Sequence, residues 1–431
     1  MLDGNRTIAK KVDWRNLNWE RLLLICFGLL PYLMVISLTG IVIFTITCLI
    51  QRPKSLVRAC YCSGLFWVFI LLVLSTLQAK FPGEAALQLL NFLPYFLVWS
   101  AIATFIAQHQ SPWRFLERLA WVLTIGSMPF CVLAGLEHVL KQSSAALFPQ
   151  LLQTLPLLDW FYTGLPTDPR AYGVFDSPNT LANYAVMVLG LALGLLVRVL
   201  VVDPQASTVH RPYPVLGISM LSLLMVLYVS GSRNGYLVAV VLLLGSLLTF
   251  KVHSWIRWAG LGLLGAIAAS ALTFGIGGRQ ISWAWVTQDP RVDVWRLALR
   301  LTRERPWLGH GLGNYKLLYD GSVPGYDAMP HAHNLWLSLS AEAGVPVMVG
   351  FTLVIGLICY QGVRLWQQMT QAPEQQALLT GYLISFFAAT VFALFDVTLY
   401  DSRLNLLAWL TLATMYGLAS RPNDSRPEKS A

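Results

Sequence analysis

The sequence predicts an all-α protein, a polytopic transmembrane helical bundle of about 12 spans with a long helical extracytoplasmic loop. The first observation behind this prediction is composition: 56% of the 431 residues are hydrophobic and only 12% are charged, against about 25% charge in ordinary soluble domains. The second is that the apolar residues form long blocks, and roughly 17–25 apolar residues cross a bilayer as a helix. The third is the net charge of +9, which in a membrane protein sets orientation, so nucleic acid is not an expected partner.

The expected spans follow the apolar blocks in chain order. They lie near 22–33, 36–50, 62–79, 87–107, 115–138, 179–201, 213–230, 235–250, 257–276, 335–363, 377–395 and 403–420. The first two blocks could form one long helix over 22–50. Basic residues flank this stretch on both sides, which favours two short helices that turn near Pro31 and return to the same side.

Positive charge also predicts how the chain is divided by the membrane. Most of the 30 Lys and Arg residues fall in inner segments when the N-terminus is placed inside, as the positive-inside rule requires. The prediction is a cytoplasmic N-terminus over 1–21, a transmembrane domain over 22–420, and a disordered cytoplasmic tail over 421–431. Two long extracytoplasmic loops are expected within the domain, at about 140–178 and 277–334.

The second long loop contains an amphipathic helical pattern between Arg291 and Gly309. Its apolar residues are Val292, Trp295, Leu299 and Leu301, and its basic residues include Arg296, Arg300 and Arg303. Pro306 is expected to end the helix. Such a helix often lies on anionic lipid headgroups, so membrane lipids are expected partners.

The polar sites of the chain all fall on the predicted outer side. They comprise Arg170 and Tyr172 before FDSPNTLANY, Arg233 in SGSRNG, Arg291, the glycine-rich WLGHGLGNY, the pair His331 and His333 in MPHAHN, and the last outer turn LFDVTLYDSR. The assignment of inner and outer segments by charge did not require this clustering. The clustering therefore indicates a functional site on the outer face.

Several of these patterns also have simpler interpretations. Arg233 could merely snorkel from the end of a span, and the glycines of GHGLG are better explained as turn formers than as a nucleotide loop. The two histidines could chelate a metal only with extended backbone geometry and a third ligand. Glu342 lies nine residues beyond His333 and would be on the opposite face of a continuous helix, so it is a poor direct partner. The sequence EAGVP, 342–346, instead predicts that one helix ends and another begins there.

Arginine and histidine together predict a definite chemistry at a membrane surface. Arginine supplies forked donors to phosphate oxygens, and a histidine can take a proton from a hydroxyl. These groups suit a substrate with a diphosphate held at the surface by a lipid tail. The chemistry predicted is glycosyl transfer from a polyprenyl-diphosphate-linked sugar, with no metal required.

Four motifs carry a resemblance to a known family. They are R-x2-G-x-F-x2-PN-x-LA from Arg170, SR-x-G from Ser232, R-x3-W with P-x2-G-x-G-x-G from Arg291, and H-x-HN-x2-L-x4-E-x-G from His331. In this order, over about 85–415, they resemble the O-antigen ligase and O-antigen polymerase superfamily of bacterial membrane glycosyltransferases. The motifs do not distinguish ligases, polymerases and protein-glycosylating enzymes.

The resemblance implies roles for individual residues. His333, which Asn334 follows as the motif demands, would be the catalytic base. Arg233 and Arg291, with Arg170 as a further candidate, would bind the donor diphosphate. The other substrate-binding candidates are His331, Asn334 and Tyr172. No cofactor or metal is implied, and the acceptor would be a hydroxyl of a glycan, lipid or protein, on the extracytoplasmic face of the bacterial inner membrane.

A rival interpretation is a membrane transporter or accessory protein without catalysis. The chain also resembles cyanobacterial proteins once proposed to be bicarbonate transporters, through its PWLG and FD-x2-LY stretches. The histidine pair of this chain favours the enzyme. A transporter should carry ionisable residues near the bilayer centre, whereas Glu137 and Arg198 lie near the ends of predicted spans.

Overall fold

The computed structural model describes residues 18–144, 146–155, 162–201, 213–249, 254–275, 289–323 and 327–421. Every regular element in these ranges is a helix, so the all-α fold class is confirmed. Nearly all of the predicted N-terminal segment 1–21 and tail 421–431, and parts of both predicted long loops, lie outside the described residues.

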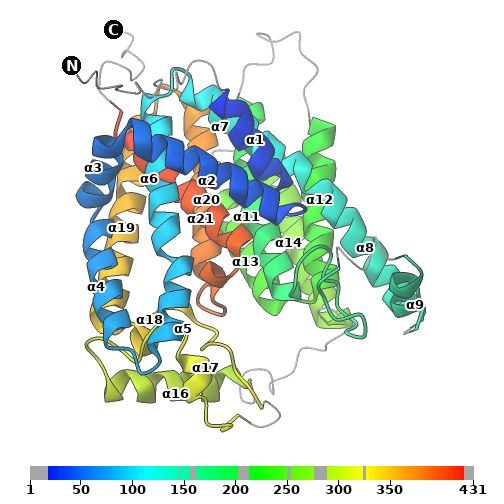
Figure 1. Cartoon of the computed structure of the whole chain (residues 1–431). Helices are drawn as coiled ribbons and strands as arrows, with labels where there is room; N and C mark the ends of the chain where they lie inside the picture. Colours follow the sequence, from blue (N-terminus) through cyan, green and yellow to red (C-terminus); the bar gives the residue numbers. More distant parts are fainter. Residues whose placement is uncertain are drawn as a thin grey trace, which may run out of the picture.

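Most of the helices pack side by side in one bundle (Figure 1). In chain order they are α1 (Trp19–Leu29), α2 (Met34–Gln51), α3 (Pro53–Ser63), α4 (Leu65–Leu77), α5 (Pro82–Gln88), η1 (Leu89–Asn91), α6 (Leu93–Gln108), α7 (Pro112–Gly126), α8 (Met128–Ser143), α9 (Leu147–Thr154), α11 (Pro178–Val201), α12 (Tyr213–Ser230), α13 (Arg233–Thr249), α14 (Ser254–Phe274), α16 (Arg291–Glu304), α17 (Tyr315–Leu318), α18 (Leu335–Glu342), α19 (Val345–Gln368), α20 (Pro373–Phe392), η2 (Thr398–Tyr400) and α21 (Ser402–Ala419).

Seven helical stretches of the described chain are long and apolar enough to cross a membrane, or up to eight if one bent pair counts as a span. They are α2, Pro82–Gln108, Pro112–Ser143, Pro178–Leu200, α12, α19 and α20, with α3 and α4 as the bent pair. The chain is therefore a multi-pass membrane protein, but the predicted count of about 12 spans is not confirmed.

Two of the predicted blocks do not form a single long membrane-crossing helix in the described chain. The stretch 22–50 does form two helices, α1 and α2, with a turn at Pro31, as predicted. However, the 11 residues of α1 rise roughly 16 Å, too short for a hydrocarbon core of about 30 Å. The block 62–79 is divided, because α3 and α4 meet at Gly64, whose φ is +90°, and bend by 80°.

The centre of the bundle is formed by α11, α20 and α21. Gly194 of α11 and Gly381 of α20 face each other so closely that a Cβ on Gly194 would lie 2.4 Å from the Cα of Gly381. Small residues allow such backbone approach between membrane helices. Helix α21 is buried along nearly its whole length and packs against α6, α19 and α20. Because α21 is held by this packing, the turn that precedes its N-terminus, 394–401, has a defined position.

The two ends of the bundle differ in content. At one end, Glu20 contacts His109 (3.5 Å), and Arg421 donates to the carbonyl of His109 (2.8 Å), so both ends of the described chain lie together. At the other end, α16, α17 and α18 lie across the bundle (Figure 1). The His331–His333 segment immediately precedes α18 and so belongs to this second end.

Candidate active site

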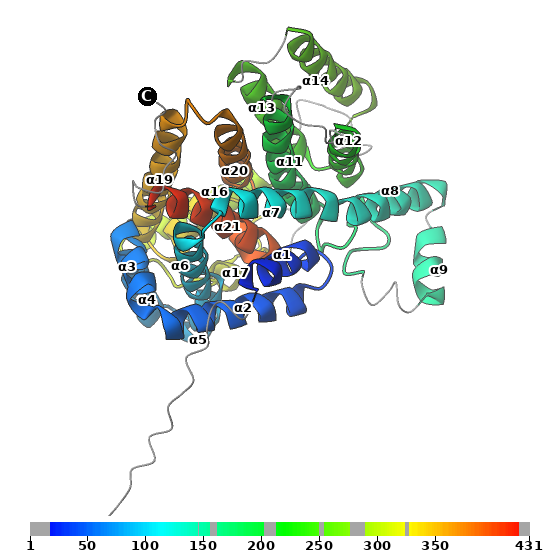
Figure 2. The same ribbon diagram turned by 90° about the horizontal axis from the view of Figure 1, so that it is seen from above.

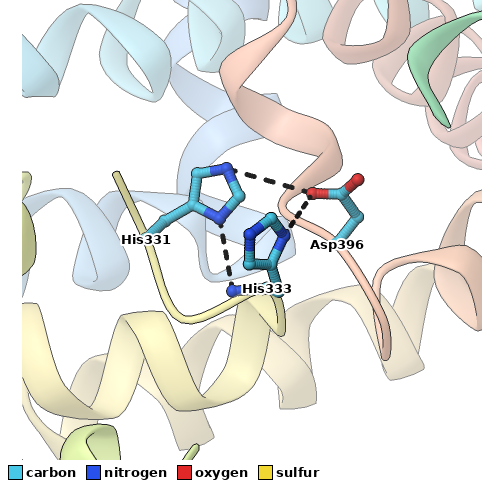
Figure 3. Close-up of side chains that lie close together, drawn as sticks. All are labelled: His331, His333 and Asp396. Atoms are coloured by element: carbon cyan, nitrogen blue, oxygen red, sulfur yellow. Dashed lines mark hydrogen bonds and ion pairs between the residues drawn. The ribbon is translucent and has the colours of Figure 1, made fainter. Parts of the chain in front are cut away.

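The histidine pair meets one carboxylate (Figure 3). Asp396 Oδ1 lies 3.5 Å from His333 Nδ1 and 3.9 Å from His331 Nε2. The backbone N–H of His333 donates to His331 Nδ1 over 3.2 Å, so His331 in its neutral form carries its proton on Nε2, towards Asp396. Asp396 comes from the turn between α20 and η2, and the site thus joins two segments distant in the sequence.

The backbone at His333 is strained. Its φ is +46°, the only positive φ of a non-glycine residue in the described chain. Residues other than glycine adopt this conformation uncommonly, and such strain is concentrated at functional sites. This left-handed residue lies directly before the N-cap of α18, and both imidazoles approach Asp396.

Asn334 holds this turn in place. As N-cap of α18, its Oδ1 accepts from Leu337 N (3.0 Å), a standard use of Asn. Its Nδ2 donates to the carbonyl of Leu394 (2.9 Å), and Leu335 N donates to the carbonyl of Ala393 (2.9 Å). The side chain of Asn334, predicted to bind substrate, is thus already engaged in joining the histidine segment to the turn that carries Asp396.

Burial and neighbouring charges set the protonation states of His331 and Asp396. Burial, with the neighbouring His333, lowers the pKa of His331 to about 4. Burial opposes ionisation of Asp396, but the two histidines hold the pKa of Asp396 below its ordinary value. At neutral pH, His331 is therefore neutral and Asp396 is negative.

The low pKa of His331 predicts acid sensitivity. His331 binds a proton near pH 6.5 in the unfolded chain but only near pH 4 in the folded chain. The neutral form of His331 therefore contributes its full share of the folding free energy above pH 6.5, and this contribution is lost as pH falls towards 4. We expect the wild type to lose roughly 1–2 kcal/mol more than His331→Asn between pH 7.5 and pH 5. Thermal unfolding of both proteins in detergent at the two pH values measures this difference. Equal losses would mean that His331 does not titrate in this way.

A polar cavity of about 220 Å³ opens beside the histidines. It is lined by residues of α11, of the 394–401 turn and of the histidine segment, among them Asn179, Asn183, His331, His333 and Asp396. Asn183 is 1% exposed, and neither polar atom of its side chain has a hydrogen-bond partner. Since buried amides are almost always paired, this one is suited to meet hydroxyls of a ligand in the cavity.

The same three side chains could hold a metal ion. Ligand atoms of His331, His333 and Asp396 lie within 4.8 Å of one another, so Asp396 is the third ligand that the histidine pair alone lacked. Two imidazoles and a carboxylate suit zinc or a similar transition metal. A metal ion bound by these three side chains is therefore an alternative to the use of His333 as a base.

Two of the predicted arginines converge on one carboxylate. Arg233 Nη2 lies 3.2 Å from Asp289 Oδ2, and Arg291 Nη1 lies 3.7 Å from the same oxygen. Arg233 begins α13 and Arg291 begins α16, so separate segments bring the two guanidinium groups to a common point. An anion is thus already held where these arginines meet.

Hydrogen bonds connect this arginine pair to the histidine cavity. Ser232, next to Arg233, donates from Oγ to Asn179 Oδ1 (3.0 Å), and Asn179 lines the cavity. The turn around Ser232 also receives a hydrogen bond from Ala171 N to the carbonyl of Val229 (3.0 Å). The segment that carries Arg170 is therefore attached to the turn that carries Arg233.

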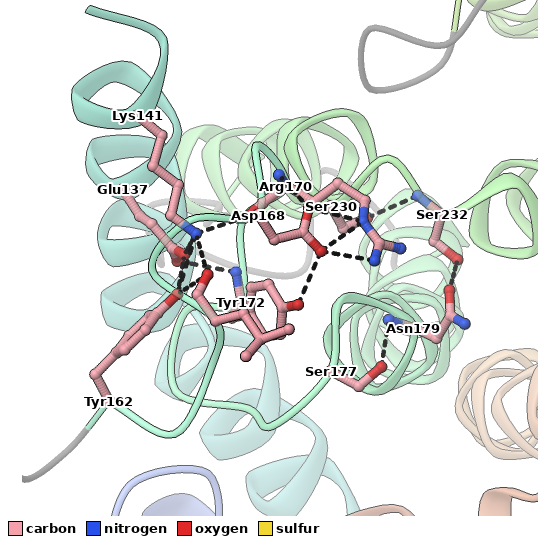
Figure 4. Close-up of polar contacts among 11 residues, drawn as sticks. Glu137, Lys141, Tyr162, Asp168, Arg170, Tyr172, Ser177, Asn179, Ser230 and Ser232 are labelled. Carbon is pink, nitrogen blue, oxygen red and sulfur yellow. Dashed lines mark hydrogen bonds and ion pairs between the residues drawn. The ribbon is translucent and has the colours of Figure 1, made fainter. Parts of the chain in front are cut away.

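The guanidinium of Arg170 is itself already paired (Figure 4). Its Nε and Nη2 donate to both oxygens of Asp168, the shortest distance being 2.7 Å. Tyr172 Oη donates to the same carboxylate (2.8 Å). Although burial opposes the charge, these bonds hold the pKa of Asp168 at about 2. Arg170 and Tyr172 therefore form a local fork, and any contact with substrate requires this pairing to change.

A buried ion pair supports that loop (Figure 4). Glu137 and Lys141 of α8 lie 2.7 Å apart, each 3% exposed. Glu137 Oε2 accepts from the backbone N–H of Tyr172 and Gly173, and Lys141 donates to the carbonyl of Arg170 (2.9 Å). These ionisable residues near the end of a span thus hold a loop in place. Arg198 is likewise paired, with Glu117 and Glu374.

The glycine-rich segment acts as a compact turn. Gly309, Gly311 and Gly313 all have positive φ. A Cβ on Gly309 would lie 2.4 Å from the backbone of Glu342, so only glycine fits between the loop and the end of α18. This agrees with the interpretation of the glycines as turn formers.

Glu342 closes the junction between α18 and α19. Its oxygens accept from Tyr315 N (3.1 Å) and Tyr400 Oη (2.9 Å). Burial raises the pKa of Glu342 to about 7, against these hydrogen bonds. Helix α18 ends at Glu342 and α19 begins at Val345, as EAGVP predicted.

The face of α16 differs from the one predicted. The buried residues are Val294, Leu297, Ala298 and Leu301, whereas of the predicted apolar set only Leu301 is buried and Leu299 is 43% exposed. The spacing i, i+3, i+4, i+7 explains the difference, because it forms one stripe against α18. Arg296 and Arg300 pair with Asp293 and Asp320 at the surface.

Three important residues were not identified from the sequence. Asp396 lies in the LFDVTLYDSR turn, which was singled out as a polar outer turn without a role for this carboxylate. Asn183 follows the PN motif inside an apolar helix. Arg403 pairs with Asp401 (2.6 Å) and donates to the carbonyl of Val174 (2.8 Å), joining two loops that line the cavity. The available signal for Asn183 was an amide within the predicted apolar block 179–201, directly after the motif that ends at Ala182.

Fold and site together define a multi-pass membrane protein with histidine, carboxylate and arginine groups gathered at one end of its helical bundle. Residues 218–352 match the family model described as O-antigen ligase. This match confirms the resemblance to the O-antigen ligase and polymerase superfamily, and it includes Arg233, Arg291 and both histidines. No curated protein matches the chain significantly.

Proposed function

We propose that the protein transfers a glycan from a polyprenyl diphosphate carrier to a hydroxyl of a glycan, lipid or protein, at the extracytoplasmic face of the bacterial inner membrane. The observation that carries the proposal is the His333–Asp396 pair beside a polar cavity with an unpaired amide. The family match supports membrane glycan transfer of this kind.

His333 is the general base of the proposed reaction. Asp396 faces Nδ1 and would stabilise the proton there, which leaves Nε2 free to accept the proton of the acceptor hydroxyl. The hydroxyl oxygen attacks the anomeric carbon of the donor sugar and forms the new glycosidic bond. The bond from that carbon to the phosphate oxygen breaks, and its electron pair leaves with the polyprenyl diphosphate.

Arg233 and Arg291 hold the departing diphosphate. Both guanidinium groups already approach one carboxylate oxygen of Asp289, which supports an anion-binding role for this position. A diphosphate carries more charge and more acceptor oxygens than a carboxylate, so it would compete for the same donors. Arg170 would join them only if its fork on Asp168 opened.

Chelation distinguishes this mechanism from a metal-dependent one at the same three side chains. We expect transfer by the purified protein to persist in excess EDTA, because the arginines neutralise the leaving group and His333 removes the proton. A metal-dependent site would instead lose activity and regain it on addition of zinc or magnesium. That result would assign His331, His333 and Asp396 to a metal.

Deletion of the gene tests the proposed function in the cell. If the protein ligates polymer to an acceptor, its loss leaves free carrier-linked polymer, and if it polymerises, its loss leaves single repeat units. Surface polysaccharide that is unchanged in amount, length and linkage would contradict glycan transfer. Complementation with the wild type should restore the polysaccharide, whereas complementation with His333→Ala should not.

A further inference from the structure

An apolar groove of about 510 Å³ runs between α19, α20 and α21. Its walls and floor include Ile355 and Cys359 of α19, Leu383 and Phe387 of α20, and Trp409 and Met415 of α21. Helices α19 and α20 stand next to each other at the edge of the bundle, with α21 further inside (Figure 2). Thr352, Gly356 and Phe387 are exposed on the open side, so the groove faces lipid.

One end of this groove reaches the histidine cavity. Thr398 lines both, and Leu335, at the same end of the groove, lies two residues after His333. From there the lining extends along α19 from Phe351 to Val363, roughly 18 Å at 1.5 Å per residue. Since α19 is one of the candidate membrane spans, the groove leads from the site into the membrane.

We propose that this groove binds the polyprenyl chain of the donor. The assignment rests on the proposed function and extends it from the diphosphate to the lipid. The occupant must meet two requirements. The apolar length of the groove accepts a hydrocarbon chain, and the end at Thr398 meets the polar cavity where, in the proposed reaction, the sugar is attacked. A donor whose lipid chain is joined directly to the diphosphate and sugar meets both requirements, and the volume lies within the usual range of ligand pockets.

Gly356 lines the groove on its exposed side. A Cβ built on this residue meets no atom within 4 Å, so a larger side chain fits there without clashing with the fold and is expected to narrow the groove. Gly217 of α12 has the same open surroundings and does not line the groove. Gly356→Phe and Gly217→Phe are therefore a matched pair of variants.

The test uses purified full-length protein in vesicles and one glycan on two carriers, a long polyprenyl diphosphate and a geranyl diphosphate. We expect Gly356→Phe to lower kcat/KM for the long-chain donor by about tenfold relative to Gly217→Phe, because excluded apolar groups lose their contacts. The geranyl donor should be used almost equally by both variants. Gly356→Leu should have a smaller effect in the same direction, and it serves as the test variant if the phenylalanine disturbs folding.

The outcomes separate the groove from the reaction. If the wild type transfers glycan but Gly356→Phe and Gly217→Phe use both donors alike, the groove does not bind the chain. If Gly356→Phe loses activity equally with both donors, the substitution acts on the site, and the proposal is again overturned. No transfer by the wild type from either donor would overturn the proposed function itself. Photocrosslinking of a benzophenone-bearing polyprenyl diphosphate to α19 or α20, abolished in Gly356→Phe, would support the groove independently of activity.

Discussion

Replacing His333 with alanine is expected to reduce the rate of glycan transfer by about 10²–10⁴-fold, the usual contribution of general-base catalysis. The side chain lies at the edge of a small polar cavity and contributes little to the packing of the bundle. The folded protein should therefore remain monodisperse in detergent. Transfer rates of purified wild type and variant, measured with saturating donor and acceptor, give the effect directly.

Two further variants separate chemistry from backbone strain at this position. Because His333 has φ +46°, asparagine is better tolerated there than alanine, so His333→Asn should keep the turn and still lose the base. His331→Ala should be milder, since the proposed mechanism gives His331 no proton to move. A His333→Asn protein that retained wild-type activity would remove His333 from the reaction.

Replacing Arg233 with lysine is expected to lower kcat/KM for the donor by about 10- to 100-fold. Lysine keeps the positive charge but loses the planar fork that matches phosphate oxygens, and hydrogen bonds to charged groups are worth about 1.5–3 kcal/mol. Arg291→Lys should behave similarly, because its guanidinium approaches the same oxygen of Asp289. Donor titration at fixed acceptor concentration measures the change.

Arg300→Ala is the matched control for this prediction. Arg300 lies on α16 beyond Arg291 and pairs with Asp320 at the surface, away from Asp289. Its loss should change membrane association slightly and leave kcat/KM for bound donor nearly unchanged. If Arg300→Ala and Arg233→Lys were equally impaired, the arginines would form a general basic surface and not a diphosphate site.

Much of the architecture was predictable because it follows from local patterns. Apolar blocks predicted helices, flanking charge predicted the turn at Pro31, and the sequence EAGVP predicted the break between α18 and α19. The shape of individual helices was not predictable in this way, because hydropathy does not show that α1 is short or that α3 and α4 bend at Gly64. The buried face of α16 depends on its packing against α18, which the sequence of α16 alone does not specify.

The sequence singles out candidate site residues one at a time. His333 and Arg233 stand out as polar residues at the ends of apolar blocks and Arg291 as a basic residue of a long loop, and the structure brings the two arginines to one oxygen of Asp289. Asp396 was missed because its role depends on the turn after α20 being joined to Asn334 and Leu335, a long-range contact. The pairing of Arg170 with Asp168, two residues away, is local, but the sequence alone does not show whether this arginine binds its neighbour or a substrate.

The proposed function requires that this chain alone moves a glycan from a polyprenyl diphosphate to a hydroxyl. To test this, purified protein in vesicles is incubated with an isotopically labelled carrier-linked glycan and an acceptor, and both products are quantified by mass spectrometry. We expect one molecule of free polyprenyl diphosphate for each new glycoside, in the presence of EDTA, with neither product formed by His333→Asn. Glycoside formation without release of polyprenyl diphosphate, or no glycoside from the folded wild type with any hydroxyl acceptor, would contradict it.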